Sequence, residues 1–312
     1  MTKTQLPSNK LSPVVTIAIV SYNTRVETVK SIQSVFNSTG FSPAELEVIL
    51  VDNNSPDDTV SYVKSHFPQV KVMANKVNKG FGGGNNQAAK VAKGKYLLLL
   101  NPDAFLAKDS LKHLVGILSK RPDVLSVGPQ LRYGDGRLQL SGGYLPTPGR
   151  VLAWMWWLDK LPLIKKLIPT PYHVIDPIWH TKPQYPEWLM GACIMFRTKE
   201  FLASGGFDEK IFMYAEEVEL YRRLKESLAK KVYFTPATKV VHLGGVSTKK
   251  ANAYRLALEL KGIEYIYQKH YPRLFWFIKF VIITGVVMRV GIFSLIPSRK
   301  DSVPEYLNYF GK

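Results

Sequence analysis

Four short apolar runs alternate with helical patterns in the first half of the chain, and this alternation is the strongest constraint on its fold. The runs lie at residues 14–20, 47–51, 70–73 and 96–100. Continuous β-branched or leucine-rich runs of this length are typical of strands that are buried on both faces. Because strands that alternate with helices need crossover connections, we expect an α/β fold with a mostly parallel central sheet flanked by helices.

The second half of the chain is less regular. It predicts a hairpin at residues 133–145, a strand at 188–196, a helix at 216–227 and short strands at 232–234 and 239–242. A strongly apolar stretch follows at residues 274–296. No internal repeat or low-complexity linker divides the chain, so one domain with a C-terminal helical appendage is the simplest interpretation.

Polar or glycine-rich residues follow each of the four apolar runs. They are Ser21-Tyr22-Asn23, Asp52-Asn53-Asn54, the stretch at 78–86 and Asn101-Pro102-Asp103. Ligands of parallel sheets gather at the carboxyl ends of the strands. We therefore expect these four segments to lie along one edge of the sheet and to form a binding site there.

Two of these segments have the chemistry of a nucleotide site. The Asp52 carboxylate can accept a hydrogen bond from the N3–H of a uracil or thymine ring, and the Asn54 side chain can hold ribose or base; an ordinary Asx turn is the alternative. In residues 78–86, backbone N–H groups at a helix start favour phosphate, and Lys79 adds a positive charge. A flexible turn is the alternative. The spacing of Gly80, Gly82 and Asn85 lacks the third glycine of a dinucleotide fingerprint.

Carboxylates and one histidine suggest a metal site and a general base. Asp103 ends a buried run of leucines, where Mg²⁺ or Mn²⁺ could bind through one carboxylate and substrate phosphates, or where a turn simply starts the next helix. His242 is a candidate third ligand or a structural histidine. Glu216 and Glu217 share a helical turn, and neighbouring carboxylates raise one another's pKa, as a base near neutrality requires. Glu219 is better explained by an ion pair with Arg222 or Arg223.

Seven motifs occur in a fixed order between residues 14 and 250. They are SYNT (21–24), VDNNSPD (51–57), NKGFGGGNN (78–86), LNPDA (100–104), GGFDE (205–209), FMYAEEVEL (212–220) and HLGGVS (242–247). This ordered set resembles the inverting GT-A glycosyltransferases of family 2, and especially their rhamnosyltransferase-like branch.

The resemblance implies a role for each candidate residue. Asp52 reads the pyrimidine, and the nucleotide-sugar site also includes Tyr22, Asn23, Asn54, Lys79, Gly80, Gly82, Asn85 and Asn101. The sequence Asn101-Pro102-Asp103 corresponds to the Asp-x-Asp metal motif, so Asp103, with His242, holds Mg²⁺ or Mn²⁺. Glu216-Glu217 matches a Glu-Asp pair whose second acid is usually the base. Glu217 is therefore the preferred base, although its extra methylene keeps Glu216 open.

The implied reaction is a single in-line displacement that moves a sugar from a dTDP or UDP donor to an acceptor hydroxyl with inversion. The favoured donor is dTDP-L-rhamnose, with UDP-hexoses as alternatives. The acceptor is expected to be a glycan or a polyprenyl-diphosphate-linked glycan in cell-surface polysaccharide synthesis. A catalytically silent homologue that serves as a membrane-bound subunit of a glycan-assembly complex is the alternative, since Asn101 and Glu217 depart from the family pattern.

The net charge of +18 favours anionic partners. Nucleic-acid motifs are missing, which favours a diphosphate substrate and an anionic membrane surface instead. Residues 154–166 mix tryptophan, aliphatic and basic side chains, as in an interfacial segment or an acceptor-pocket lid. Residues 274–296 are long enough to span a bilayer, but Lys279 and Arg289 favour an interfacial or shallowly inserted helix over a clean span, with a buried core helix as the alternative. With one cysteine and no secretory signal, we expect a peripheral protein on the cytoplasmic face of the membrane.

These patterns predict three parts of the chain. Residues 1–13 form a polar N-terminal tail. Residues 14–250 form the catalytic domain, with a nucleotide-sugar-binding half at 14–130 and an acceptor half at 131–250 that carries an insertion at 150–187. Residues 251–312 form a helical, membrane-associated segment.

Overall fold

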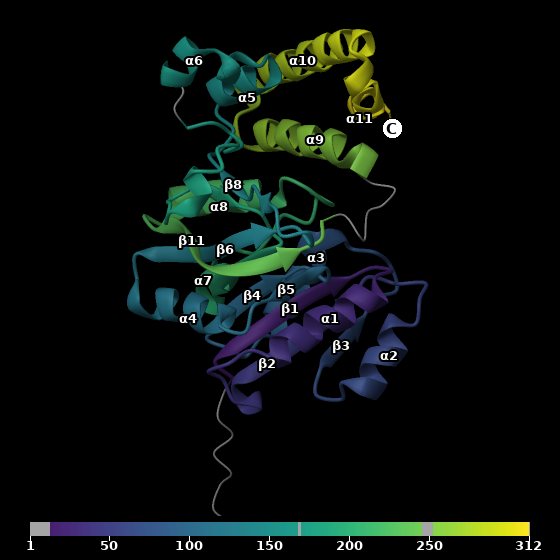
Figure 1. Cartoon of the computed structure of the whole chain (residues 1–312), viewed down its shortest axis with the longest axis vertical. Helices are drawn as coiled ribbons and strands as arrows, with labels where there is room; N and C mark the ends of the chain where they lie inside the picture. Colours follow the sequence, from purple (N-terminus) through teal and green to yellow (C-terminus); the bar gives the residue numbers. More distant parts are fainter. Residues whose placement is uncertain (1–12, 168–169, 245–251, 312) are drawn as a thin grey trace, which may run out of the picture.

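A computed structural model describes residues 13–167, 170–244 and 252–311 of the chain. Its centre is a nine-stranded sheet of order β3-β2-β1-β4-β10-β6-β11-β5, with β7 paired to β6 (Figure 1). The strands are β1 Val15–Ser21, β2 Leu46–Asp52, β3 Lys71–Ala74, β4 Tyr96–Leu100, β5 Ala104–Leu106, β6 Val124–Arg132, β7 Leu138–Gln139, β10 Cys193–Arg197 and β11 Lys231–His242. A separate two-stranded sheet joins β8 Gly142–Gly143 to β9 Trp188–Leu189.

The first four strands of this order run parallel, as the sequence predicts, whereas β5, β7 and β10 are antiparallel to their neighbours. The register aligns Ser21 with Asp52, and Ile19 with Leu100. The predicted polar segments therefore leave the sheet at the same edge, because parallel strands that are in register end together.

Successive residues of the central strands enter two different cores, since side chains alternate across a strand. Ile17 and Ile19 of β1 pack with the helices α1 Arg25–Phe36, α2 Thr59–His66 and α4 Ser110–Lys120. Ala18 faces the other core, which includes residues of α3 Gly80–Val91, α7 Thr198–Ala203, α8 Glu216–Ser227 and the C-terminal helices. Both faces of the sheet are covered, which explains why the strands read as continuous apolar runs.

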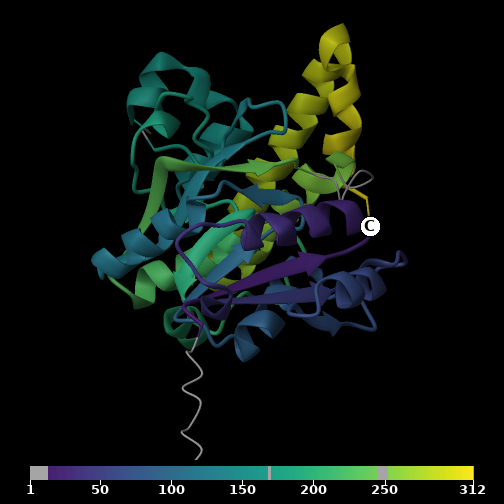
Figure 2. The same ribbon diagram turned by 60° about the horizontal axis from the view of Figure 1, so that its bottom comes forward.

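The remaining helices gather at one end of the molecule, away from β2 and β3 (Figures 1 and 2). They are α5 Pro148–Met155, α6 Pro162–Leu167, α9 Asn252–His270, α10 Phe275–Leu295 and α11 Val303–Leu307, and short 3-10 turns include η2 Leu158–Lys160 and η3 Trp179–Thr181. A Cβ on Gly285 of α10 would lie 2.8 Å from Cβ of Met155 in α5. The two helices therefore touch at their backbones, and α10 is packed onto the insertion.

One face of α10 is buried and the other is exposed and apolar. The buried positions recur at helical spacing and include Ile278, Val281, Ile282, Gly285, Val286 and Arg289. The exposed side carries Trp276, Phe277, Phe280, Val287 and Leu295. By length and hydropathy, Pro272–Leu295 is the one helix in residues 13–167, 170–244 and 252–311 that could cross a membrane.

Several local predictions were wrong at their boundaries. The glycine-rich stretch at 78–86, expected at a helix start, lies mostly inside the helix, because α3 already begins at Gly80. The strand expected at 188–196 is two strands, β9 and β10, separated by a bend at Gly191. The two short strands at 232–242 are one strand with a register shift between Thr235 and Lys239. Residues 1–12 of the expected tail, and the last three residues of the HLGGVS motif, lie outside the described residues.

Candidate active site

The predicted pyrimidine-binding segment is held in an unusual backbone conformation. Asp52 is buried, and one carboxylate oxygen accepts the backbone N–H of Ser55 at 2.9 Å while the other accepts its hydroxyl. The Ser55 hydroxyl in turn accepts the Asn23 N–H at 2.8 Å. Asn23 and Asn54 both have left-handed φ angles, 53° and 67°. Asparagine tolerates this conformation better than most residues, which explains its presence at both positions.

Tyr22 and Asp52 stand on neighbouring strand ends with different exposure. Tyr22 is 41% exposed, whereas the carboxylate of the buried Asp52 keeps lone pairs beyond the two that Ser55 uses. Asn53 ties this edge to the glycine-rich helix, because its Nδ2 donates to Gly80 O at 3.0 Å. The predicted nucleotide residues of β1, β2 and α3 are thus brought to one region, with an exposed ring beside a buried carboxylate.

The glycines at the start of α3 allow close packing. Gly80 has φ 72°, and a Cβ there would lie 2.2 Å from Phe212 O. A Cβ on Gly82 would lie 2.9 Å from Cβ of Phe207. The helix start therefore lies directly against residues 207–212, which lead into α8. The N-cap residue is Lys79, and Asn85 donates to Phe81 O at 3.0 Å. Contact with a phosphate stays a prediction.

Asn101, Asp103 and His242 come together, as the metal prediction requires. Nε2 of His242 lies 3.4 Å from Oδ1 of Asp103 and 3.2 Å from Nδ2 of Asn101. The other ring nitrogen, Nδ1, lies 2.9 Å from Oε1 of Gln139 on β7. An amide oxygen only accepts, so this contact places the proton on Nδ1 and leaves the Nε2 lone pair to accept the Asn101 Nδ2–H, with Asp103 Oδ1 close by. Gln139 was missed because nothing near it in the sequence indicates this contact.

The donor set fits a divalent metal that has few protein ligands. In the part of the chain that the structure describes, no group of three or more His, Cys, Asp or Glu side chains is arranged to hold a metal ion. Asp103 and His242 supply one oxygen and one nitrogen ligand, and Gln139 orients the imidazole in the manner common around protein metals. A metal here would complete its coordination with substrate phosphates and water.

Glu216 and Glu217 begin α8 and differ in their surroundings. Glu216 is 3% exposed, and its Oε2 has no hydrogen-bond partner in the described structure. Glu217 is partly exposed, and its Oε1 accepts the Gly191 N–H at 2.7 Å. Burial raises the pKa of both carboxyls, and the charge of Glu217 raises the pKa of Glu216 further. The Gly191 bond favours the charged form of Glu217, which makes Glu217 the better base of the two.

The bend before β10 connects Glu217 to the segment Asn101-Pro102-Asp103. Gly191 N–H binds Glu217, and the next residue, Ala192, accepts the Asn101 N–H through its carbonyl at 2.9 Å. Consecutive Cα atoms are about 3.8 Å apart. The predicted base and the predicted metal motif are therefore held by adjacent residues of one bend, although 116 positions separate Glu217 from Asn101 in the chain.

The loop that precedes Glu216 is strained and tightly enclosed. Tyr214 and Ala215 have left-handed φ angles of 66° and 71°. On one side Phe212 O lies against Gly80, and on the other a Cβ at Gly262 of α9 would lie 2.6 Å from Cβ of Ala215. Two successive non-glycine residues in this region cost about 1–3 kcal/mol each and occur mainly at functional sites. The C-terminal helix α9 therefore helps to hold the start of α8.

A third carboxylate, Glu259 of α9, was also missed. Its Oε1 accepts the Tyr172 hydroxyl at 2.9 Å and lies 2.8 Å from His173 Nε2. Burial raises its pKa, but His173 and the other nearby donors outweigh this and leave it lowered. The negative charge of Glu259 raises the pKa of Glu217. The sequence did contain a signal for Glu259, because this carboxylate lies beside the apolar positions Ala257 and Leu260 of an amphipathic helix.

Glu219 is structural, as its spacing to Arg223 suggested. Its carboxylate is fully buried, not on a solvent face, and binds Arg223, Lys269 and His270 at 2.8–3.0 Å, 2.7 Å and 3.0 Å. These partners lower its pKa against the effect of burial. It joins α8 to the end of α9 and leaves Glu216 and Glu217 as the acidic pair of the site.

The sequence of this chain is similar to those of known proteins. The family model described as Glycosyl transferase family 2 matches residues 16–178, just over half of the chain. N-acetylglucosaminyl-diphospho-decaprenol L-rhamnosyltransferase of Mycobacterium tuberculosis is 27% identical over 242 residues, which cover 69% of this chain and 72% of the relative. Rhamnosyltransferase WbbL of Escherichia coli is 25% identical over 204 residues, 62% of this chain and 72% of the relative.

Solved structures show the same fold at lower sequence identity. GalNAc-T7, crystallised with UDP, GalNAc and Mn²⁺, superposes with a TM-score of 0.56 at 18% identity over 82% of this chain; the match spans 48% of GalNAc-T7. Residues 1–349 of Staphylococcus aureus TarS give a TM-score of 0.52 at 15% identity, over 95% of this chain and 88% of TarS. The expected GT-A-like α/β fold, with an apolar C-terminal helix, is confirmed.

Proposed function

Because this chain belongs to glycosyl transferase family 2, we propose that it transfers L-rhamnose from dTDP-L-rhamnose to a hydroxyl of a lipid-linked glycan, with inversion. The enzyme class follows from the family. The donor is inferred from two relatives named as rhamnosyltransferases, one of which is named for a diphospho-decaprenol acceptor. The observation that carries the proposal is the bend at Gly191–Ala192, which holds Glu217 beside Asn101.

Glu217 is proposed as the general base. Its carboxylate is partly exposed and receives one backbone N–H, so it can be ionised and still reach an acceptor hydroxyl. The buried Glu216, with its more strongly raised pKa, would stay protonated beside it. Proton removal by Glu217 as the acceptor oxygen attacks the anomeric carbon gives a single displacement and thus inversion.

Asp103 and His242 are proposed to hold the metal, and His242 Nε2 would bind it in place of the Asn101 Nδ2–H. When bound, the metal would neutralise negative charge on the departing diphosphate. An imidazole ligand favours a transition metal, so Mn²⁺ suits this pair better than Mg²⁺. Two groups of residues are proposed to bind the donor. The pyrimidine nucleoside is held by Asp52, with Tyr22, Asn23 and Asn54. The rest of the donor lies against Lys79 and the start of α3, with Gly80, Gly82 and Asn85.

The exposed apolar face of α10 is proposed to lie in the membrane interface on the cytoplasmic side. Arg289 faces inward, where its guanidinium donates to the carbonyls of Trp154 and Met155 at the end of α5. Cations stabilise the C-terminal end of a helix. This contact would be lost if α10 left the protein to cross the bilayer alone, so a shallowly inserted helix is favoured over a span.

Nucleoside diphosphate release tests the proposal. Purified full-length protein would be given dTDP-L-rhamnose or UDP-hexoses, Mn²⁺ and a bacterial lipid extract, beside Glu217→Gln and Glu216→Gln. We expect release from dTDP-L-rhamnose to be lost in Glu217→Gln and largely kept in Glu216→Gln. Release from a UDP-hexose alone would refute the donor. Binding of dTDP without release in any mixture would favour the silent-homologue alternative.

A further inference from the structure

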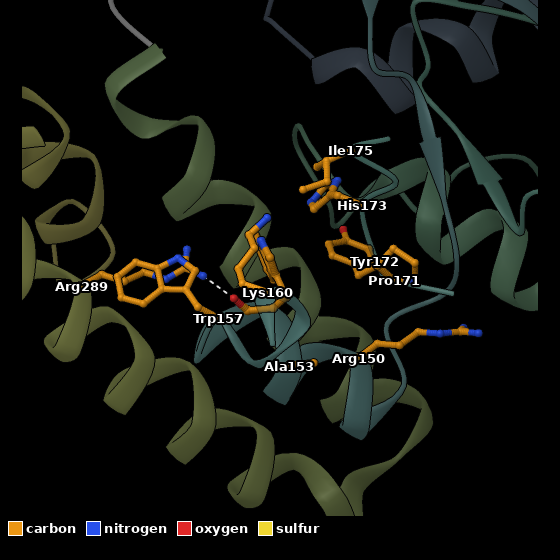
Figure 3. A pocket seen from close by; sticks show the side chains of 10 residues that line it. Arg150, Ala153, Trp157, Lys160, Pro171, Tyr172, His173, Ile175 and Arg289 are labelled. Atoms are coloured by element: carbon orange, nitrogen blue, oxygen red, sulfur yellow. Dashed lines mark hydrogen bonds between the residues drawn. The ribbon is translucent and has the colours of Figure 1, made fainter. Parts of the chain in front are cut away.

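A basic cavity of about 140 Å³ lies between the insertion and the C-terminal helices. Figure 3 shows its lining side chains coming from α5 and η2, from residues 171–175 and from α10. Three cations, Arg150, Lys160 and Arg289, line it together with Trp154, Trp157, Tyr172 and His173, and no acidic residue is among the lining side chains that the structure describes. This lining favours an anionic ligand that also has apolar surface.

The charges of the cavity are built into the fold. Arg289 is 4% exposed and donates to two backbone carbonyls and to the Tyr306 hydroxyl. Its guanidinium also lies 4.9 Å from the Trp157 ring centroid. Arg289 forms no ion pair within the described residues, so its charge is stabilised there by carbonyl and hydroxyl oxygens and by aromatic rings. Arg150 shares its charge with Glu187, at 2.8 Å.

The backbone of Trp157 is a second, independent indication that the cavity binds a ligand. Its φ of 53° is left-handed, a conformation that is uncommon for a bulky side chain. The other four non-glycine residues with positive φ in the described chain are Asn23, Asn54, Tyr214 and Ala215. All four lie in the site described above. Since such strain occurs mainly at functional sites, the fifth instance marks the cavity as a place of ligand contact.

Tyr172 connects the cavity to the acidic residues of the site. It lines the cavity, and its hydroxyl donates to Glu259. Burial raises the pKa of Tyr172, and the charges of Glu259, Glu217 and Glu216 raise it further. A group bound in the cavity therefore contacts a tyrosine that is joined to Glu259, the carboxylate whose charge acts on the proposed base. Its volume is that of roughly five waters at about 30 Å³ each, which suits a headgroup but not a whole glycolipid.

We infer that this cavity binds the diphosphate of the lipid-linked acceptor and so places the acceptor sugar beside Glu217. The inference rests on the proposed function, because it assumes an acceptor with a lipid diphosphate. The exposed apolar side chains of α6, Leu163 and Leu167, and the outer face of α10 belong to the elements around the cavity. The lipid chain would leave the cavity along these apolar surfaces.

Binding of farnesyl diphosphate to the full-length protein tests the inference. The measurement is made in neutral detergent micelles, with dTDP and UDP in excess so that the donor site is filled. Lys160→Glu is expected to weaken binding by about tenfold, because it reverses one charge of the lining. Lys120→Glu, an equal charge change at the exposed end of α4 and away from both the cavity and the apolar surfaces around it, is the matched control and should bind as the wild type does.

Two further ligands, farnesol and inorganic pyrophosphate, test which part of farnesyl diphosphate the cavity binds. Farnesol, which lacks the diphosphate, should bind weakly and to the same extent in all three proteins. Equal binding of farnesol and farnesyl diphosphate, or equal weakening by the two lysine variants, would overturn the inference. Inorganic pyrophosphate that binds as tightly as farnesyl diphosphate would also overturn it, in favour of a free anion site. Trp157→Asn, which keeps the left-handed backbone but loses the ring, should weaken binding of farnesyl diphosphate.

A failure of the cavity assignment can be distinguished from a failure of the proposed function. The affinity for dTDP is measured on the same proteins without farnesyl diphosphate and should not change in Lys160→Glu. If dTDP fails to bind the wild type, the proposed function fails, while farnesyl diphosphate still reports on the cavity. If dTDP binds and farnesyl diphosphate does not, only the cavity assignment fails.

Discussion

Replacing Gly191 by alanine should disable the base without unfolding the protein. A Cβ on Gly191 would lie 2.9 Å from Oε1 of Glu217 and 2.9 Å from Cζ of Phe81. Ordinary contacts of a Cβ begin near 3.4 Å, so the methyl group requires a shift of about half an ångström or more. Both contacting atoms are the far ends of side chains, which can move. The carboxylate is expected to yield, with a loss of stability of about 1–3 kcal/mol from overpacking.

Such a displacement acts on the proposed chemistry. A misplacement near 1 Å in an active site costs about 100-fold in rate, so we expect kcat to fall by roughly 10- to 100-fold. The assay is nucleoside diphosphate release at saturating donor, with thermal unfolding and dTDP affinity measured on the same sample. The affinity for dTDP should not change, because Gly191 touches no residue proposed to hold the pyrimidine nucleoside.

Gly116→Ala is the matched control for this variant. Nothing lies within 4 Å of a Cβ at Gly116, which is in the middle of α4. Replacing glycine by alanine in a helix stabilises by about 0.5–1 kcal/mol, so this variant should be slightly more stable and fully active. Wild-type turnover in Gly191→Ala would refute the argument, since Glu217 would then tolerate displacement and could not be the positioned base.

Three other changes test separate parts of the site. Gln139→Ala should weaken Mn²⁺ binding by about 10- to 100-fold, because His242 would lose the partner that sets its tautomer; calorimetric titration of Mn²⁺ in the presence of dTDP measures this. A base must be deprotonated, so kcat/KM should fall as the pH drops through the raised pKa of Glu217. Glu259→Gln removes a negative charge that raises this pKa, so the acidic limb should move to lower pH; a shift to higher pH would contradict the assignment. Phe280→Glu places a charge on the outer face of α10 and should reduce sedimentation with anionic vesicles, while leaving dTDP affinity unchanged; unaltered sedimentation would exclude this face from the membrane contact.

The strands and the strand-end residues were predictable because they depend on local sequence. A run of β-branched residues buries itself in the same way wherever it lies, and a parallel sheet brings the ends of its strands together. The errors arose where tertiary contacts decide. β5, residues 104–106, is too short to give a pattern, and β11 continues past Pro236 because β6 pairs with it on both sides of a register shift.

The residues that support the site were harder to predict from the sequence. Gln139 lies 103 positions before His242, and Gly191 lies 26 before Glu217, so no local motif links either pair. Glu259 could have been found, since a carboxylate on the apolar side of an amphipathic helix needs a partner. Its partners, Tyr172 and His173, lie in the insertion, whose path the sequence did not predict.

The contact between Gly262 and Ala215 has a practical consequence for anyone who wishes to handle this protein without detergent. The usual remedy is to cut off a hydrophobic end and keep the water-soluble part. Here a cut before α9 would also remove the helix that presses on the left-handed loop ahead of Glu216. The shortened protein would keep its sheet and the edge proposed to hold the nucleotide, yet its acidic pair would lose one of the two surfaces that fix it. Solubility is better sought by changing the outer side chains of α10 and leaving the helix in place.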